Sequence, residues 1–256
     1  MIETAGSLTV AGVPAVSVAT MSEIDRLAIE EFGISLLQMM EQAGSHLAEV
    51  VRQELGGDLR DRSIVVAAGP GNNGGGGLAA ARHLINRGAR VRVVLSRPAL
   101  RMTEAGRSQL ATLISMGAMC CVVTYDLSDD ELETALGGAD LVVDAILGYS
   151  IQGAPRGEAE RLVGFINRSG RPVVSLDIPT GIDPDTGAVD GLAVSATATL
   201  TLALPKPGLM MAAGIAHTGR IYLADIGLPA ALYARLGLQV GPLFANSRII
   251  RLDPNP

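Results

Sequence analysis

The chain has 256 residues, of which 48% are hydrophobic and 18% are charged, and its net charge at pH 7 is −6. This composition is typical of a globular protein with a sizeable core rather than of a disordered chain. Aromatic residues make up only 3%, and no run rich in lysine or arginine occurs. The charge and the stacking surfaces of a nucleic-acid-binding protein are therefore both missing, and we expect a small-molecule ligand.

The N-terminal residues and the apolar runs bear on the location of the protein. Residues 1–19 include Glu3 but neither lysine nor arginine, unlike the basic start of a secretory signal. No uninterrupted apolar run is long enough to form a membrane-spanning helix. We therefore expect a cytoplasmic protein without a membrane partner.

The cysteines and histidines predict neither a disulfide framework nor a zinc site. Cys120 and Cys121 are adjacent, and a bridge between neighbours would be strained. We expect both to be small core residues of a strand over 119–124. The histidines are far apart in the chain and show no metal-ligand spacing: His46, His83 and His217.

Two helices are expected at the start of the chain. Residues 21–32 carry apolar side chains at helical spacing, and Ser22 is a candidate helix cap. A second helix is expected over 35–55, where Gly56 and Gly57 would end it.

From residue 63 onward, short apolar runs alternate with helical patterns. Strands are expected over 64–68, 90–95, 119–124, 141–146 and 172–176, with two more over 197–204 and 220–224 at one edge. Helices are expected over 77–87, 103–116, 129–136 and 158–168. This alternation predicts a three-layer αβα Rossmann-like fold, a mostly parallel sheet with helices on both faces. Because no repeat, linker or composition break is visible, we predict one domain over 1–256, with the N-terminal helices (21–55) packed on it.

Three unusual segments follow strands of this predicted sheet. They are the glycine-rich segment 69–77, Asp144 near the end of the fourth strand counted from 64–68, and Asp177 after the fifth. In the common strand order 3-2-1-4-5 the first and fourth strands are neighbours, and ligands bind outside their carboxyl ends. We therefore expect the three segments to share one crevice. The alternative for each acid is that it only caps the following loop through backbone N–H groups.

The glycine-rich segment 69–77 opens a predicted helix, an arrangement that favours phosphate, although a tight turn alone would also explain it. No Lys-Ser/Thr pair follows, so the segment is not a Walker phosphate loop. The second strand ends at Leu95-Ser96, without an acid for a ribose hydroxyl. An ordinary NAD-dependent dehydrogenase is therefore disfavoured.

Five motifs occur in a defined order along the chain. They are 40–44 (Met-Glu-Gln-Ala-Gly), 71–77 (Gly-Asn-Asn-Gly-Gly-Gly-Gly), 143–148 (Val-Asp-Ala-Ile-Leu-Gly), 177–183 (Asp-Ile-Pro-Thr-Gly-Ile-Asp) and 205–208 (Pro-Lys-Pro-Gly). At these motifs the chain resembles the NAD(P)H-hydrate epimerase family, also described as the YjeF N-terminal domain. The resemblance implies epimerisation at C6 of hydrated NADH or NADPH, a repair step that lets a dehydratase restore the cofactor. A separate protein would have to supply that dehydratase.

The resemblance also implies the site residues. It implies a potassium ion held by Asn73, Asp144 and Thr180, whose oxygen atoms suit a hard cation. Asp177 corresponds to the central acid that contacts the substrate. The other residues implied to bind the cofactor hydrate are Asn72, Asn73, Gly74, Gly75, Gly76, Gly148, Tyr149, Ser150, Ile151, Gln152, Gly153 and Ala154.

One position departs from the family pattern, because the family's Asp in the glycine-rich segment is Gly76 here. Four consecutive glycines predict a more flexible loop, and the lost carboxylate predicts weaker ligand binding. We therefore expect Gly76→Asp to tighten the binding of an NADP-type ligand. The departure also favours an alternative function, a non-catalytic nucleotide-binding homologue. A small-molecule kinase is a more distant alternative, opposed by the missing Lys-Ser/Thr pair.

The chemistry at C6 explains why an acid is needed. The ring nitrogen can expel the C6 hydroxyl once that hydroxyl is protonated, and water can return to either face of the planar iminium. Our hypothesis is that Asp177 protonates the leaving hydroxyl and later deprotonates the incoming water. The ion and the glycine-rich segment would orient the rest of the nucleotide.

An apolar stripe on the second predicted helix bears on the oligomeric state. It consists of Leu36, Leu37, Met39 and Met40. We predict that it forms a homodimer contact, and the alternative is that it packs on its own domain.

Overall fold

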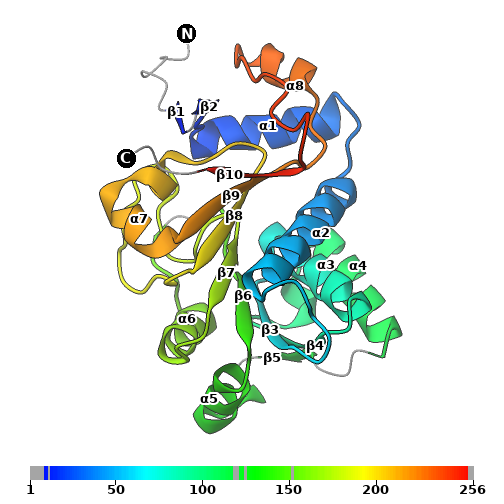
Figure 1. Ribbon diagram of the computed structural model, residues 1–256, viewed down its shortest axis with the longest axis vertical. Helices are drawn as coiled ribbons and strands as arrows, with labels where there is room; N and C mark the ends of the chain where they lie inside the picture. Colours follow the sequence, from blue (N-terminus) through cyan, green and yellow to red (C-terminus); the bar gives the residue numbers. More distant parts are fainter. Residues whose placement is uncertain (1–8, 11, 118–120, 124–125, 151–152, 253–256) are drawn as a thin grey trace.

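The computed structural model describes residues 9–10, 12–117, 121–123, 126–150 and 153–252. A sheet crosses the middle of the molecule (Figure 1). Its strands are β3 (Ser63–Ala68), β4 (Arg90–Leu95), β5 (Cys121–Val123), β6 (Leu141–Ala145), β7 (Val173–Leu176), β8 (Ala198–Leu202), β9 (Arg220–Ala224) and β10 (Ile249–Leu252). A two-stranded hairpin, β1 (Thr9–Val10) and β2 (Val13–Pro14), precedes them.

The spatial order of the sheet is β10-β9-β8-β7-β6-β3-β4-β5, and only β10 runs antiparallel to its neighbour. Counted from β3, the first five strands have the predicted order 3-2-1-4-5, which is confirmed. β3 and β6 are therefore neighbours, with Ala68 opposite Ala145 in the register. Almost every residue of these two strands is buried, as expected for central parallel strands covered on both faces.

The helices are α1 (Val18–Glu30), α2 (Leu36–Glu54), α3 (Asn72–Asn86), α4 (Glu104–Ser115), α5 (Asp129–Gly137), α6 (Glu158–Arg168), α7 (Ala212–Thr218) and α8 (Ala230–Arg235), with short 3₁₀ turns at η1 (Ala99–Arg101) and η3 (Pro207–Met210). In the described part of the chain, none of the helices is long and apolar enough to cross a membrane.

Alternate residues of β3 enter two different cores, because successive side chains of a strand point to opposite faces. Ile64 and Val66 pack with side chains of α2, α3 and α4, whereas Val65 and Ala67 pack with those of α5 and α6. Figure 1 shows these two groups of helices on opposite sides of the sheet. The predicted three-layer αβα architecture is confirmed.

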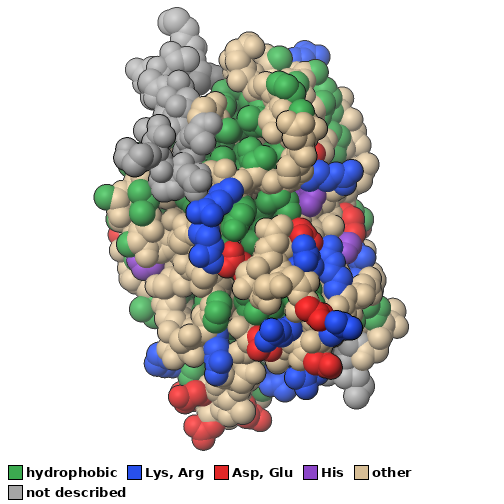
Figure 2. Space-filling model, in the orientation of Figure 1, with side chains coloured by type: hydrophobic (Ala, Val, Ile, Leu, Met, Phe, Trp, Pro, Cys, Tyr) green, Lys and Arg blue, Asp and Glu red, His purple; other side chains and the backbone are tan. Residues whose placement is uncertain are grey.

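A third core lies where α1 and α8 cover the end of the sheet that carries β9 and β10. It contains Ile24 and Leu27 of α1, Leu232 of α8 and Leu223 of β9. In Figure 2, hydrophobic side chains gather in the upper part of the visible face, while charged side chains of both signs lie mainly in the lower part. Helix α1 thus packs against this end of the sheet.

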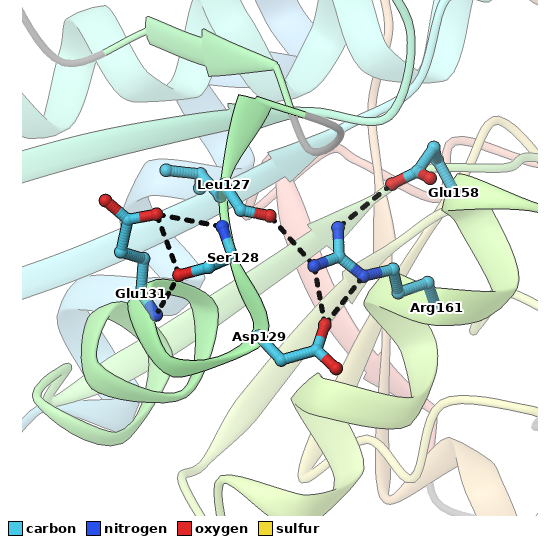
Figure 3. A network of polar contacts seen from close by, with 6 residues as sticks. All are labelled: Leu127, Ser128, Asp129, Glu131, Glu158 and Arg161. Atoms are coloured by element: carbon cyan, nitrogen blue, oxygen red, sulfur yellow. Dashed lines mark hydrogen bonds and ion pairs between the residues drawn. The ribbon is translucent and has the colours of Figure 1, made fainter.

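A polar network joins α5 and α6, which lie on the face of the sheet opposite to α2, α3 and α4 (Figure 3). Arg161 of α6 donates to Asp129 Oδ1 at 2.6 Å and to the carbonyl oxygen of Leu127 at 2.9 Å. Ser128 caps α5, and the Glu131 carboxylate accepts from the backbone N–H of Ser128 at 2.8 Å. This capping box explains why α5 begins at the predicted residue.

Several predicted boundaries differ from the structure. The first helix begins at Val18 and is capped by Ser17, not Ser22, because the Ser17 hydroxyl accepts from the Thr20 N–H. The helix expected over 77–87 begins at Asn72, so the glycines are helical rather than a loop. The pairing of β10 with β9 was not predicted. The strand expected over 119–124 is described only at Cys121–Val123, and Cys120 lies outside the described residues.

Candidate functional site

The glycine-rich segment, the turn that follows Asp144 and Asp177 itself converge on one pocket of about 290 Å³ at the carboxyl ends of β3, β6 and β7. Asp144 does not line this pocket. The predicted binding residues that line it are Asn72, Asn73, Gly76, Gly148, Tyr149, Ser150 and Asp177. Apolar side chains of α1 and α2 form much of the remaining wall, including Met21, Met39 and Met40. A pocket therefore lies where the crevice was predicted, and the N-terminal helices form part of its wall.

Other predicted binding residues lie elsewhere. Gly74 and Gly75 are buried inside α3 and do not line the pocket. Gly153 and Ala154, in the segment between β6 and α6, are not buried and do not line it either. Ile151 and Gln152 lie outside the described residues.

The glycines of α3 allow close packing rather than loop mobility. A Cβ atom at Gly74 would overlap the carbonyl oxygen of Gly69, and one at Gly77 would lie 2.5 Å from Ala145 Cβ. Gly76 is different, because a Cβ there would meet only the end of the Leu176 side chain, at 2.8 Å. The expectation of a loop at this point is wrong, since helical packing already orders the four glycines.

The pocket opens onto the N-terminus of α3. Gly71 is the N-cap and no side chain caps the helix, so the first backbone N–H groups of the helix remain available. The positive end of a fifteen-residue helix favours an anionic group here.

Asp177 forms a buried ion pair that the sequence analysis missed. Lys206 Nζ donates to Asp177 Oδ1 at 2.5 Å and to the carbonyl oxygen of Leu202 at 3.1 Å. Only 1% of Lys206 and 3% of Asp177 are exposed. The other carboxylate oxygen of Asp177 accepts from the Tyr149 N–H at 3.1 Å. A lysine between two prolines in an otherwise apolar stretch was the sequence signal for this residue.

Asp177 also adopts an unusual backbone conformation, with φ at +68°. Positive φ is uncommon for residues with a Cβ, although aspartate tolerates it better than most. The conformation follows directly after β7 and turns the chain so that the carboxylate faces the pocket. Such backbone strain is often found at functional sites.

Asp25 is a second acid of the pocket, and it was also missed. The Tyr149 hydroxyl donates to Asp25 Oδ2 at 2.5 Å. Burial raises the pKa of Asp25, while the Tyr149 hydrogen bond opposes this shift. Burial also raises the pKa of Tyr149, and the negative charge of Asp25 adds to that effect. The signal in the sequence was an acid next to Ile24, on the otherwise apolar side of the first predicted helix.

Asp144 holds the segments around the pocket together. Its fully buried carboxylate accepts from Ser175 Oγ at 2.8 Å, from the Thr180 N–H at 2.9 Å and from Thr180 Oγ1 at 2.7 Å. Burial raises the pKa of Asp144, and the hydrogen bonds from Thr180 oppose the shift. The loop-capping alternative therefore describes part of what Asp144 does.

The three predicted potassium ligands surround the turn that follows β6. Thr180 Oγ1 accepts from the Leu147 N–H at 3.1 Å, and Asn73 Nδ2 donates to the Leu147 carbonyl oxygen at 2.9 Å. Asp144 contacts Thr180 directly, so all three residues are joined through Leu147. A carboxylate, a hydroxyl and an amide oxygen around one turn are a donor set that fits a hard monovalent cation.

Comparison with known proteins identifies the family. The profile described as "YjeF-related protein N-terminus" matches residues 36–208. The chain belongs to this family. The match leaves Asp25 outside it and includes Asp177 and Lys206.

Relatives of this YjeF-related domain have informative names. It is 41% identical over 225 residues to the NAD(P)H-hydrate epimerase of Dehalogenimonas lykanthroporepellens, covering 88% of this chain and 86% of the relative. It is 40% identical over 220 residues to the bifunctional NAD(P)H-hydrate repair enzyme Nnr of Moorella thermoacetica, covering 86% of this chain but only 41% of that longer protein.

A solved structure supports the fold of this YjeF-related domain. The crystal structure of yeast ynu0, YNL200c superimposes with a TM-score of 0.80 at 27% sequence identity, covering 94% of this chain and 100% of the yeast chain. The similarity thus extends over almost all of the domain.

Proposed function

We propose that this YjeF-related domain epimerises C6 of hydrated NADH and NADPH. The observation that carries the proposal is the Asp177 carboxylate, held by Lys206 and the Tyr149 N–H at the wall of the pocket. Relatives at 41% and 35% identity are named NAD(P)H-hydrate epimerase, and they match 88% and 82% of this chain.

We place the reacting ring and the diphosphate of the nucleotide at two different parts of the site. A volume of about 290 Å³ is at the small end for ligand pockets, so we place the hydrated nicotinamide ring inside it. The apolar side chains of Met21, Met39 and Met40 would cover the ring and exclude water. The diphosphate would lie at the N-terminus of α3, where the free N–H groups favour its charge.

Acid–base chemistry at C6 follows from this placement. Protonation of the C6 hydroxyl lets the ring nitrogen expel it as water and leaves a planar iminium. Removal of a proton from a returning water molecule completes the exchange. Asp177 is the acid–base group of this proposal, because its carboxylate faces the pocket. Proton transfer by a positioned carboxyl group typically accelerates such steps by about 10²–10⁴-fold.

A potassium ion is part of the proposal. Asn73, Asp144 and Thr180 would hold it, since their side chains gather around the turn at Leu147. When bound, the ion would supply a positive charge that fixes this turn and attracts the anionic nucleotide. Asp144 would gain a compensating charge for its complete burial.

Two protein partners are predicted, a dehydratase and a second copy of this chain. The bifunctional relatives imply a dehydratase as functional partner. The homodimer prediction loses its original motive, because Met39 and Met40 are buried and line the pocket, and Leu36 packs on the third core. Leu37 is the exposed member of the stripe, at 43%.

The direct test is an assay of purified hydrate epimers. Incubation of one separated epimer of NADPH hydrate with the protein should produce the second epimer, as followed by NMR or chromatography. Asp177→Asn is the matched control, and it should leave only the spontaneous rate. NADP⁺ binding without epimerisation by the wild type would instead support the non-catalytic nucleotide-binding homologue that Gly76 favours.

A further inference from the structure

Tyr149 connects the two acids of the pocket through opposite ends of one residue. Its backbone N–H donates to Asp177 Oδ2 at 3.1 Å, and its hydroxyl donates to Asp25 Oδ2 at 2.5 Å. Both carboxyl groups line the same pocket, as does Tyr149 itself. The two acids are therefore held apart by the length of a tyrosine, one at the end of β7 and the other on α1.

The two acids differ in their electrostatic surroundings. Asp177 is ion-paired with Lys206, so it carries a partner for its negative charge. For Asp25 the largest influence is burial, which raises its pKa; Tyr149 and Lys206 lower that pKa and Asp177 raises it. Tyr233 is a further ionisable neighbour, and its own pKa is raised by burial and in part by Asp25. Burial thus favours the protonated form of Asp25, whereas the carboxylate of Asp177 has a buried cation beside it.

Epimerisation requires proton transfer on both faces of the nicotinamide ring, which is difficult for one carboxyl group. The hydroxyl leaves from one face of the ring, and water must add to the opposite face. A single acid reaches only one face, unless the ring turns over inside a narrow pocket. We propose that Asp25 is a second catalytic carboxyl group, acting on the opposite face of the nicotinamide ring from Asp177. This inference rests on the proposed epimerase function.

The protons balance in either direction. When the C6 hydroxyl faces Asp25, the protonated Asp25 transfers its proton as the C6–O bond breaks, and water leaves. Asp177 then takes a proton from the water that forms the new C6–O bond on its own face. The reverse reaction returns the proton from Asp177 to Asp25, and Tyr149 holds both groups throughout.

Oxygen exchange separates this arrangement from a single-acid site. In ¹⁸O-labelled water, wild-type protein should introduce label into both epimers, because every inversion exchanges the C6 oxygen. Asp25→Asn removes the acid from one face only. We expect it to slow inversion at least about a hundredfold. It should still exchange the oxygen of one epimer, the one whose hydroxyl faces Asp177.

Asp177→Asn provides the reciprocal measurement, because it should confine the remaining exchange to the other epimer. Tyr149→Phe is a second route to the same result if Asp25→Asn does not fold. It releases Asp25 without removing either carboxyl group, so inversion should fall more than exchange at the Asp177 face. Thermal unfolding and NADP⁺ binding of each variant establish that the pocket persists.

The outcomes distinguish the inference from the function on which it rests. Unchanged inversion in Asp25→Asn, or an equal loss of exchange from both epimers, would overturn the role of Asp25 while leaving an epimerase with one acid. Absence of both inversion and exchange in the wild-type protein would instead reject the proposed function.

Discussion

Lys206 Nζ lies 2.5 Å from Asp177 Oδ1, and both side chains are almost completely removed from solvent. The charge of Lys206 is thereby balanced inside the protein by a group that also faces the ligand. Breaking a buried pair leaves one charge without a partner, at a cost of about 3–5 kcal/mol in protein stability. The pair therefore connects the folding of the domain to its chemistry.

The first prediction separates these two roles. Asp177→Asn should abolish measurable epimerisation and also lower the unfolding temperature, because Lys206 stays buried without its carboxylate. Asp177→Asn combined with Lys206→Met should recover much of the stability but none of the activity. Thermal unfolding and the epimerisation assay on both variants test this. A double variant that is no more stable than the single one would contradict the argument from the unpaired charge.

The second prediction concerns the glycines of α3. Gly74→Ala should destabilise the domain by about 1–3 kcal/mol or more, because its Cβ would overlap the Gly69 carbonyl oxygen. Gly76→Ala is the matched control, since its Cβ meets only the end of the Leu176 side chain. Chemical denaturation of both proteins should show the larger loss at Gly74. Equal losses would contradict the argument from close packing at Gly74, because helix propensity favours alanine at both positions.

The third prediction tests the departure from the family at Gly76. Gly76→Asp should tighten NADP⁺ binding, but the Leu176 side chain must move to admit it, since the two would approach to 2.8 Å. Gly76→Asp with Leu176→Val makes the necessary space and should show the gain more clearly in titration calorimetry. Weaker binding by both variants would indicate that the pocket is organised around glycine at this position.

The fourth prediction concerns the cation. Replacing sodium with potassium should strengthen NADP⁺ binding by the wild type and should have little effect on Asp144→Asn, which loses the charged ligand. Ser175→Ala is a useful control, because it removes a hydrogen bond to Asp144 at 2.8 Å while leaving the three predicted ligands in place. A well-resolved structure in potassium buffer with only water among these oxygens would count against the ion.

The fifth prediction follows from the raised pKa of Asp25. A carboxyl group whose pKa is raised by folding binds protons more tightly in the folded state, so its contribution to stability is lost as pH rises above the unfolded value of 3.8. Asp25→Asn cannot lose a proton. Its unfolding temperature relative to wild type should therefore rise between acidic and neutral pH. Asp190→Asn supplies the control, because it removes an exposed carboxyl group in the same way.

The sequence by itself determined the architecture of this protein. The alternation of apolar runs and helical patterns was enough for the three-layer fold, and the assumed strand order placed segment 69–77 beside Asp144 and Asp177, as the structure confirms. These features depend on local periodicity and on general rules of strand connection, which a single sequence carries.

Only the tertiary structure decided which side chains meet. Asp25 and Lys206 lie 181 positions apart in the sequence, yet both line the pocket beside Asp177. The start of α3 at Asn72 could not be predicted either, because glycine has a low helix propensity. Glycine is required in this helix by its close packing against Gly69 and Ala145, which only the folded chain shows. Periodicity shows which face of an element is buried. Which charges share that burial depends on contacts between distant segments, and these exist only once the sheet and its covering helices have assembled.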